Sequence, residues 1–265
     1  MSGWADPETA QYYEAFCVSH SRYAEANEAL ITRACVEPGM RLLDLAAGTG
    51  RTAEQAIRHL GEFGSVLCVE PAAGMRSEGM RRLSDPRVEW TPNLPGANGS
   101  FDRILCGAAI WQMLPLAETF RVLERLLRPA GALCFNIPAA YLLEPDEPGG
   151  GSDPCLLSLP ALLMERPDQV PARGEHGGQG SEPLRADAIG TWLSACFQRV
   201  ECWSFRLRLT QESYAQWLKI PVMTERLLGL LPPAERARRI DEALLRVDRK
   251  SWKWERWRGW TAWSA

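Results

Sequence analysis

The stretch LLDLAAGTGR, residues 42–51, decides the fold of this chain. Its apolar start is typical of a buried strand, and Asp44 stands near the end of that strand. A loop of small residues follows, in which Gly48 and Gly50 permit positive φ and let a ligand lie close to the backbone. The next helix begins with unpaired N–H groups and the positive end of its dipole. Strand, glycine loop and helix in this order predict a nucleoside site.

Strand and helix signals alternate on the C-terminal side of this stretch. Most of the strands are continuously apolar, which is typical of a parallel sheet covered on both faces by helices. We therefore expect an α/β fold: a doubly wound, Rossmann-like, mostly parallel sheet with an antiparallel edge strand. The expected strands are 40–45, 65–70, 87–90, 101–106 and 131–137, and the expected helices are 51–60, 73–83 and 116–127.

The rest of the chain is organised around this core. Residues 8–36 are weakly amphipathic and predict one or two helices, and residues 138–183 are rich in proline and glycine, with a short apolar segment at 155–164 that predicts a helix. We interpret the proline-rich stretch as a cap insertion; the alternative is a disordered linker. The expected parts are a helical N-terminal lid (1–36), a Rossmann-like cofactor-binding core (37–137), the cap (138–183) and a C-terminal completion of the sheet (184–265).

The C-terminal part is expected to add one or two strands. A strand at 256–265 would most simply pair antiparallel with a strand at 199–209 at the sheet edge. The helices expected there are 185–195, 211–219 and 233–248.

Two acidic residues separate the possible cofactors. Glu70 lies twenty residues after Gly50, at the end of the next strand, where a carboxylate can accept both hydroxyls of a ribose. Residues 48–53 also fit the dinucleotide pattern G-x-G-x-x-A. A dinucleotide would bring its pyrophosphate near Asp44, whereas the ammonium and sulfonium of S-adenosylmethionine (SAM) are attracted by a carboxylate. Asp44 therefore favours SAM over NAD.

Several motifs resemble those of the class I SAM-dependent methyltransferases, especially the small-molecule enzymes of quinone and natural-product pathways. LLDLAAGTG is similar to their first motif, and VLCVEPAAGM, ending at Met75, to their second. The likeness spans roughly residues 10–210 and is strongest over 40–137. It continues in GSFDRIL at 99–105, in RVL and LRPAGAL between 121 and 133, and in residues 193–200.

The resemblance implies a set of cofactor-binding residues. Ala46, Ala130 and Cys196 stand where relatives often have glycine. Trp90 or Thr91 stands where an acidic residue often bonds the adenine amine, so stacking and a hydroxyl would have to substitute for it. The implied contacts are Tyr23, Asp44, Ala46, Gly48, Gly50, Glu70, Pro71, Met75, Trp90, Thr91 and Cys106.

Methyl transfer from a sulfonium needs mainly proximity and a dry site, with a general base in some enzymes. Of three histidines, His20 and His176 are the candidate bases, because His59 lies near the far end of a helix. Tyr13, Trp111 and Gln112 are candidate substrate contacts. The alternative for the tyrosines is aromatic packing of the lid, and for Trp111 burial beneath the cap.

Composition limits the partners and the compartment. A net charge of −3 disfavours nucleic acid and anionic membranes, although the tail at 250–263 mixes basic and aromatic residues. We interpret that tail as an amphipathic edge strand. The apolar runs are far shorter than the roughly 20 residues of a membrane span, and a secretory start is lacking. Eight cysteines without C-x-x-C spacing indicate reduced thiols, no metal site and a cytoplasmic protein.

These features predict SAM-dependent methyl transfer to a small organic acceptor, either a secondary metabolite or a quinone-like compound, with S-adenosylhomocysteine (SAH) as the product. One alternative is a SAM-binding protein that uses the cofactor without methyl transfer. The net charge disfavours a nucleic-acid or protein methyltransferase, and Asp44 disfavours a nicotinamide oxidoreductase.

Overall fold

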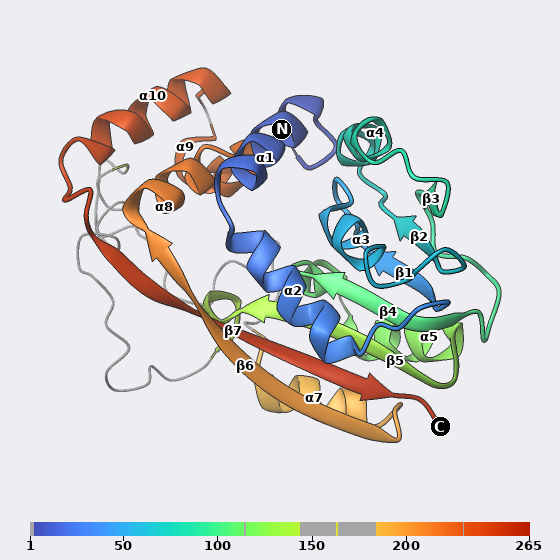
Figure 1. Ribbon diagram of the computed structural model, residues 1–265. Coiled ribbons are helices and arrows are strands. Elements are labelled where there is room, and N and C mark those ends of the chain that lie inside the picture. The colour runs from blue at the N-terminus through green and yellow to red at the C-terminus, as the bar shows by residue number, and fades with distance from the viewer. Residues whose placement is uncertain (1–2, 114, 144–162, 164–183, 230) are drawn as a thin grey trace.

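A computed structural model describes residues 3–113, 115–143, 163, 184–229 and 231–265. In this part of the chain seven strands form one sheet in the order β3-β2-β1-β4-β5-β7-β6 (Figure 1). The first five pair in parallel, and β7 runs antiparallel to both of its neighbours. The strands are β1 (Arg41–Leu45), β2 (Ser65–Val69), β3 (Val88–Thr91), β4 (Phe101–Gly107), β5 (Leu127–Pro138), β6 (Arg199–Thr210) and β7 (Trp252–Trp263).

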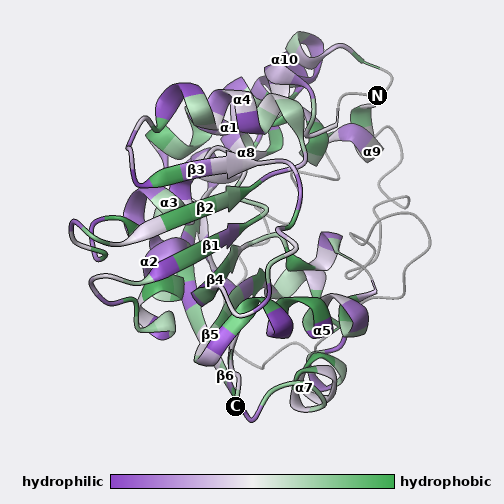
Figure 2. Cartoon of the chain, turned by 90° about the vertical axis from the view of Figure 1, so that its right-hand side faces the viewer, coloured by the Kyte–Doolittle hydropathy of each residue, from purple (hydrophilic) through white to green (hydrophobic). Residues whose placement is uncertain are grey.

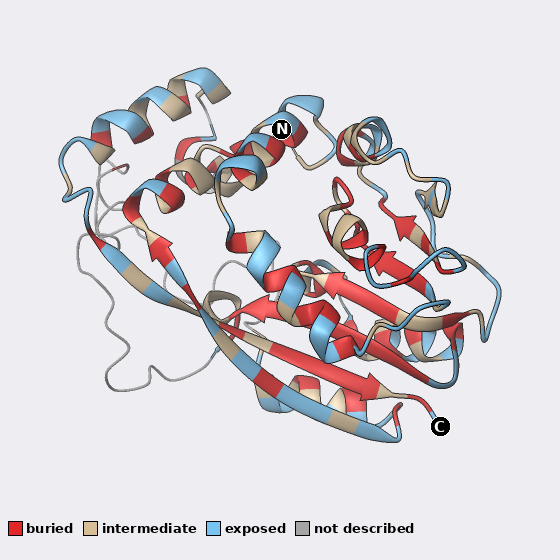
Figure 3. Ribbon diagram, viewed as in Figure 1, coloured by how far each residue is buried: buried red, intermediate tan, exposed pale blue. Residues whose placement is uncertain are grey.

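Helices cover both faces of the sheet, so the predicted doubly wound α/β fold is confirmed. The apolar side chains of α5 and α7 pack on one face, and those of α2 and α3 on the other. Figure 2 shows the apolar character of the central strands and Figure 3 their burial. The helices are α1 (Pro7–Ser19), α2 (Arg22–Ala34), α3 (Arg51–Ala56), α4 (Ala73–Arg82), α5 (Leu116–Leu126), α7 (Ala186–Ser194), α8 (Gln211–Leu218), α9 (Glu225–Leu228) and α10 (Pro233–Leu244), with 3-10 turns η1 (Ile110–Gln112), η2 (Ala139–Tyr141) and η4 (Pro221–Met223).

The last strand lies inside the sheet. Its predicted antiparallel pairing with β6 is present, but β7 is inserted between β5 and β6, so that β6 is the edge strand. Trp257 and Trp260 explain this position, since both are fully buried and Trp260 stacks on Phe135 of β5 at 5.3 Å between ring centroids. Two large aromatic side chains lose more water-exposed surface inside a sheet than at its edge.

The N-terminal region forms the two helices α1 and α2. Asp6 caps α1 by accepting a hydrogen bond from the Glu8 N–H at 2.9 Å. α1 lies across the end of the sheet toward α4 and α8, and the Gly74 N–H of α4 donates to the Ala5 carbonyl at 3.1 Å (Figure 1). The chain before α1 is therefore fastened to the first turn of α4.

Several predicted boundaries differ from the structure by one to four residues: the helix expected at 233–248 ends at Leu244, for example, and the strand expected from 256 begins at Trp252. The helix expected at 51–60 ends at Ala56, because the backbone continues in tighter i→i+3 turns through Leu60. β5 begins at Leu127, four residues earlier than expected, because Leu127 pairs with Phe101 of β4 before a bulge.

Most of the predicted cap, residues 144–162 and 164–183, lies outside the described residues, and with it most of the expected 155–164 helix. Leu163 is described and is buried with side chains of α8 and α10. None of the described helices combines the length and the apolar character that a membrane span requires.

Candidate active site

The loop between β1 and α3 holds an unusual run of left-handed backbone. Ala46, Gly48 and Gly50 have φ of 53°, 57° and 79°. The Ala47 N–H donates to the carbonyl of Val69, which brings the loop beside the end of β2. A non-glycine residue in this region costs about 1–2 kcal/mol. This cost explains why glycine is expected at position 46, and Ala130, the second substituted glycine position, likewise has a φ of 60°.

Asp44 is buried beneath this loop. Its side chain is only 2% exposed, and its Oδ2 accepts the Ala53 N–H at 3.0 Å, which caps the first turn of α3. Its Oδ1 has no hydrogen-bond partner among the described residues. Burial raises the pKa of Asp44 to about 8, and the charge of Glu70 adds to the rise. The sequence predicts Asp44 near the end of its strand, beside the cofactor; the structure encloses its side chain under the loop, because an unpaired helix N-terminus needs an acceptor.

Glu70 accepts hydrogen bonds from the loop after β1 and from the segment after β2. Its Oε2 accepts the Gly48 N–H at 2.8 Å, and its Oε1 accepts the Ala72 N–H at 2.7 Å. Burial raises its pKa, while both backbone donors and Arg76 oppose the rise. A carboxylate has about four lone-pair sites, so each oxygen keeps capacity for a further donor such as a ribose hydroxyl. Glu70 is thus placed as predicted, at the end of β2 beside the glycine loop.

Three other residues predicted to surround the nucleoside lie beside Glu70 or the glycine loop. Thr91 lies beside Glu70, since its carbonyl accepts the Glu70 N–H at 2.9 Å. Pro71 is exposed directly after Glu70, and Met75 is buried close to Gly48.

Trp90 is another residue predicted to contact the nucleoside. Its ring packs between Gly50 and Gly79, on the sheet face that α3 covers. This packing separates α3 from α4 and leaves Thr91 as the residue of the pair that adjoins Glu70. The adenine contact expected of Trp90 or Thr91 stays a prediction.

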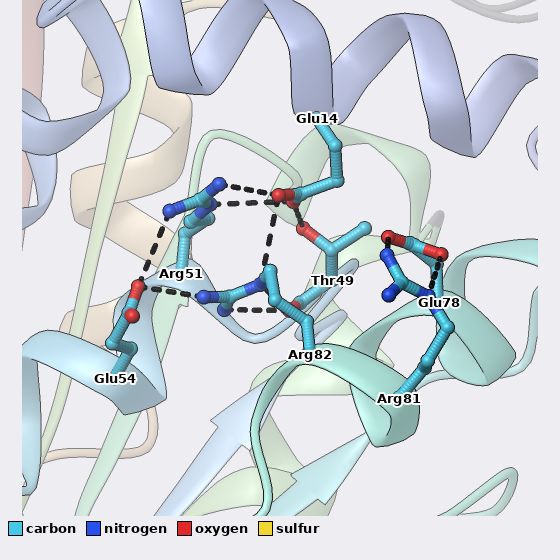
Figure 4. A network of polar contacts seen from close by, with 7 residues as sticks. All are labelled: Glu14, Thr49, Arg51, Glu54, Glu78, Arg81 and Arg82. Atoms are coloured by element: carbon cyan, nitrogen blue, oxygen red, sulfur yellow. Dashed lines mark hydrogen bonds and ion pairs between the residues drawn. The ribbon is translucent and has the colours of Figure 1, made fainter.

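A network of charged side chains, for which the sequence pattern gives no signal, fastens α1 to the glycine loop (Figure 4). Glu14 of α1 accepts hydrogen bonds from the Thr49 hydroxyl and from the Arg51 guanidinium. Arg82 of α4 donates to the Thr49 carbonyl at 2.9 Å and pairs with Glu54 at 2.8 Å. Two acidic and two basic side chains thereby balance each other over the loop, which places the predicted lid directly against the candidate site.

The predicted lid residues form an aromatic cluster. Tyr13 packs on Tyr23 at 5.4 Å between ring centroids, and Phe16 packs on both Tyr23 and His20. Burial raises the pKa of Tyr13 well above its usual value, so the phenol stays protonated. His20 lies at the C-terminal end of α1, and burial lowers its pKa, while the charge of Glu212 opposes the change. The expected role of His20 as a base stays a prediction, and His176 lies outside the described residues.

The carboxyl ends of β4 and β5 carry the predicted substrate contacts. Trp111 of η1 stacks on Tyr141 of η2 at 4.3 Å, and Gln112 beside it is exposed. Cys106 is fully buried in β4; burial raises its thiol pKa, and the acidic side chains of Asp44 and Glu70 add to the rise. Cys106 therefore lies near both acidic residues but within the apolar core.

Asn136 holds this end of the sheet to α2. Its Oδ1 accepts the Ala108 N–H and its Nδ2 donates to the Ala26 carbonyl, each at 2.9 Å. The sequence did carry a signal for it, because Asn136 is the polar residue in the otherwise apolar strand GALCFNI. A buried polar group must find partners, so such a residue marks a fixed junction.

Comparison with known proteins finds a match to the central part of the chain. Residues 43–135 match the family model described as "Methyltransferase domain". Ubiquinone/menaquinone biosynthesis C-methyltransferase UbiE of Coxiella burnetii is 30% identical over 109 residues, which cover 38% of this chain and 44% of that protein. The chain thus matches less than half the length of this curated relative.

Solved structures match much more of the chain at low identity. YcgJ from Bacillus subtilis has a TM-score of 0.58 at 17% identity and covers 91% of this chain and 98% of its own. Phosphoethanolamine N-methyltransferase 2 of Haemonchus contortus, solved with SAH and phosphomonomethylethanolamine, has a TM-score of 0.54 at 16% identity, covering 90% and 52%. The [4+2]-cyclase SpnF has a TM-score of 0.53 at 16% identity, covering 90% and 79%. These matches show the fold.

Proposed function

We propose that this chain, whose residues 43–135 match a methyltransferase family model, binds SAM as a class I enzyme and transfers its methyl group to a small organic acceptor. The observation that carries the proposal is the pair of carboxylates at the ends of β1 and β2. Asp44 and Glu70 flank one glycine loop, and Glu70 bonds that loop directly.

The residues present suit SAM. The buried Asp44 Oδ1 has no hydrogen-bond partner among the described residues. A nearby positive charge, such as the sulfonium of SAM, would stabilise the ionised form of this carboxyl group. Glu70 retains lone pairs for the ribose hydroxyls, and the loop of residues 46–50, left-handed at Ala46, Gly48 and Gly50, offers backbone without bulky side chains. Thr91, Pro71 and Met75 would surround the base.

When bound, SAM supplies a methyl group already activated by its sulfonium. The protein then has to position the acceptor and keep water out. The stacked rings of Trp111 and Tyr141 provide an apolar wall at the ends of β4 and β5. Such a wall suits an aromatic or quinone-like acceptor, and the partial match to a quinone C-methyltransferase supports the same class.

A second candidate function is the use of SAM without methyl transfer. The fold is shared with a protein described as a [4+2]-cyclase, so the fold alone does not fix the reaction. Methyl transfer to some acceptors needs a general base. The candidate base His20 packs on Phe16 at the end of α1, an arrangement that also fits a protein without such a base.

Incubation of the full chain with SAM labelled in its methyl group tests the proposal. The acceptors are a panel of hydroquinones, phenols, amines and carboxylic acids, with label in the product as the readout. We expect label in at least one aromatic or quinone-like acceptor, and at least tenfold less with Glu70→Ala. Tight SAM binding without label in any acceptor would favour the second function.

A further inference from the structure

Arg22, the first residue of α2, is a buried cation whose hydrogen-bonding capacity is only partly used. Its side chain is 7% exposed, and its Nε and Nη2 pair with Glu255 of β7 at 2.8 and 2.5 Å. Its Nη1 is buried and has no hydrogen-bond partner among the described residues. A buried donor of this kind is costly unless something accepts its hydrogen bond.

The planar geometry of the Arg22 guanidinium determines from which side a hydrogen-bond acceptor can approach Nη1. Because the guanidinium is planar and Glu255 occupies the edge formed by Nε and Nη2, Nη1 faces away from the carboxylate. Three aromatic rings surround the group: Trp217 at 4.8 Å, Tyr23 at 5.3 Å and Trp257 at 5.7 Å from its central carbon. Trp217 also donates to the Tyr23 hydroxyl at 3.0 Å, which fixes two of these rings.

Arg22 lies at the acceptor side of the candidate site. Ala26, one helical turn further along α2, is bonded by Asn136 near the end of β5, and Trp257 pairs with Pro138, the last residue of that strand. Tyr141 follows shortly after Pro138 and carries the stacked Trp111. Burial raises the pKa of the Tyr141 phenol and the nearby charge of Arg22 opposes the rise, so the two groups lie within electrostatic reach. The stacked Trp111 and Tyr141 pair and the Arg22 guanidinium therefore lie at the same end of β5.

We infer that Nη1 of Arg22 donates a hydrogen bond to an uncharged oxygen, such as a ring carbonyl, of an aromatic acceptor held against Trp111 and Tyr141. This inference rests on the proposed function, since it names the substrate class of the same site. The oxygen is uncharged because Glu255 already neutralises Arg22. A carboxylate would add a buried charge without a counter-charge.

The test is equilibrium binding to the full chain with SAH present, using three probes. 1-Tetralone carries a ring carbonyl, tetralin has the same rings without oxygen, and 1-naphthoate carries a negative charge. We expect 1-tetralone to bind about tenfold more tightly than tetralin, as one hydrogen bond from a charged donor would give, and more tightly than 1-naphthoate. Arg22→Lys should abolish the preference for 1-tetralone, because Lys keeps the pair with Glu255 but lacks Nη1.

Arg33→Lys is the matched control. Arg33 is also on α2 and also lies over a tryptophan, Trp203 at 5.8 Å, but it is exposed. It should behave as wild type. Should Arg22→Lys fail to fold, the pair Arg22→Met with Glu255→Gln removes both charges together and should show the same loss.

Three results would overturn the inference: equal binding of 1-tetralone and tetralin to wild type, a wild-type preference in Arg22→Lys, or tightest binding of 1-naphthoate. Because the readout is binding alone, it separates the two proposals. An Arg22-dependent preference without any methyl transfer would refute the proposed function and leave this site standing, and transfer without the preference would do the reverse.

Discussion

At the scale of single residues, Asp44 has both a structural role in the glycine loop and an expected role in binding SAM. One oxygen caps α3, and the other has no partner among the described residues. Burial lifts its pKa from the usual 3.8 to about 8, so its contribution to the free energy of unfolding falls as the pH rises from about 4 toward 8. The loss occurs because the unfolded chain ionises this group freely over that range, whereas the fold resists its ionisation.

This titration predicts a pH dependence for SAM binding. Ionised Asp44 attracts the sulfonium, so SAM affinity should rise between pH 6 and about 8 relative to Asp44→Asn, whose side chain stays uncharged. Comparing the two proteins removes the titration of the SAM amino group, and SAH, which lacks the sulfonium charge, should show a smaller difference. Calorimetry over this range gives both curves. Asp102→Asn is the control, since Asp102 also accepts a backbone N–H, at 2.7 Å from Arg41. Parallel curves for wild type and Asp44→Asn would contradict the assignment.

Ala46 gives a prediction about stability. Because Ala46 has a φ of 53°, Ala46→Gly should relieve strain and raise the free energy of unfolding by about 0.5 kcal/mol, after the entropy cost of glycine. Ala47→Gly, at the buried neighbour without positive φ, should lower it by about 1 kcal/mol. Urea unfolding measures both. Equal losses in the two variants would show that position 46 is not strained.

These residues also show how far the sequence could lead. Glu70 and the glycine loop were predictable, because their positions follow from the strand-loop-helix order. The burial of Asp44 and the ion pairs of Glu14 were not, because both depend on where α1 and α3 settle in three dimensions. The face that Trp90 occupies follows from alternation along β3, which sends its side chain and that of Thr91 to opposite faces, and its predicted contact with the adenine stays a prediction.

At the scale of elements, the N-terminal segment docks on α4 and on the glycine loop. The backbone of Ala5 and Asp6 packs against Gly74 so closely that a Cβ there would lie 2.6 Å from the Ala5 carbonyl oxygen. Glu14 fastens the same segment to Thr49 and Arg51. The lid predicted from a weak amphipathic pattern is thus held by a close backbone contact and by charges, which no periodicity could have shown.

Gly74→Ala should therefore loosen the lid. We expect a loss of about 1–3 kcal/mol in the free energy of unfolding, because the added methyl group displaces the Ala5–Asp6 backbone, and faster amide exchange in α1. Gly190→Ala in α7 is the matched control: its Cβ meets nothing within 4 Å, so helix propensity should raise stability slightly. Unchanged exchange in α1 of Gly74→Ala would contradict the role given to this contact.

At the scale of the whole molecule, the two halves of the proposed site lie at the carboxyl ends of the parallel strands. The ends of β1 and β2 carry the nucleoside side, and the ends of β4 and β5 carry the aromatic acceptor side. The parallel core was predictable from its alternating strands and helices. The insertion of β7 between β5 and β6 was not, because antiparallel pairing with β6 is equally satisfied at the edge and only the burial of Trp257 and Trp260 decides the order.

The most direct test of the account is a calorimetric titration of the full chain with SAM and with NAD. The account predicts a SAM dissociation constant in the micromolar range, at least tenfold weaker binding by Glu70→Ala without loss of the fold, and no measurable binding of NAD. Tight binding of NAD together with millimolar binding of SAM, or wild-type affinity for SAM in Glu70→Ala, would contradict it.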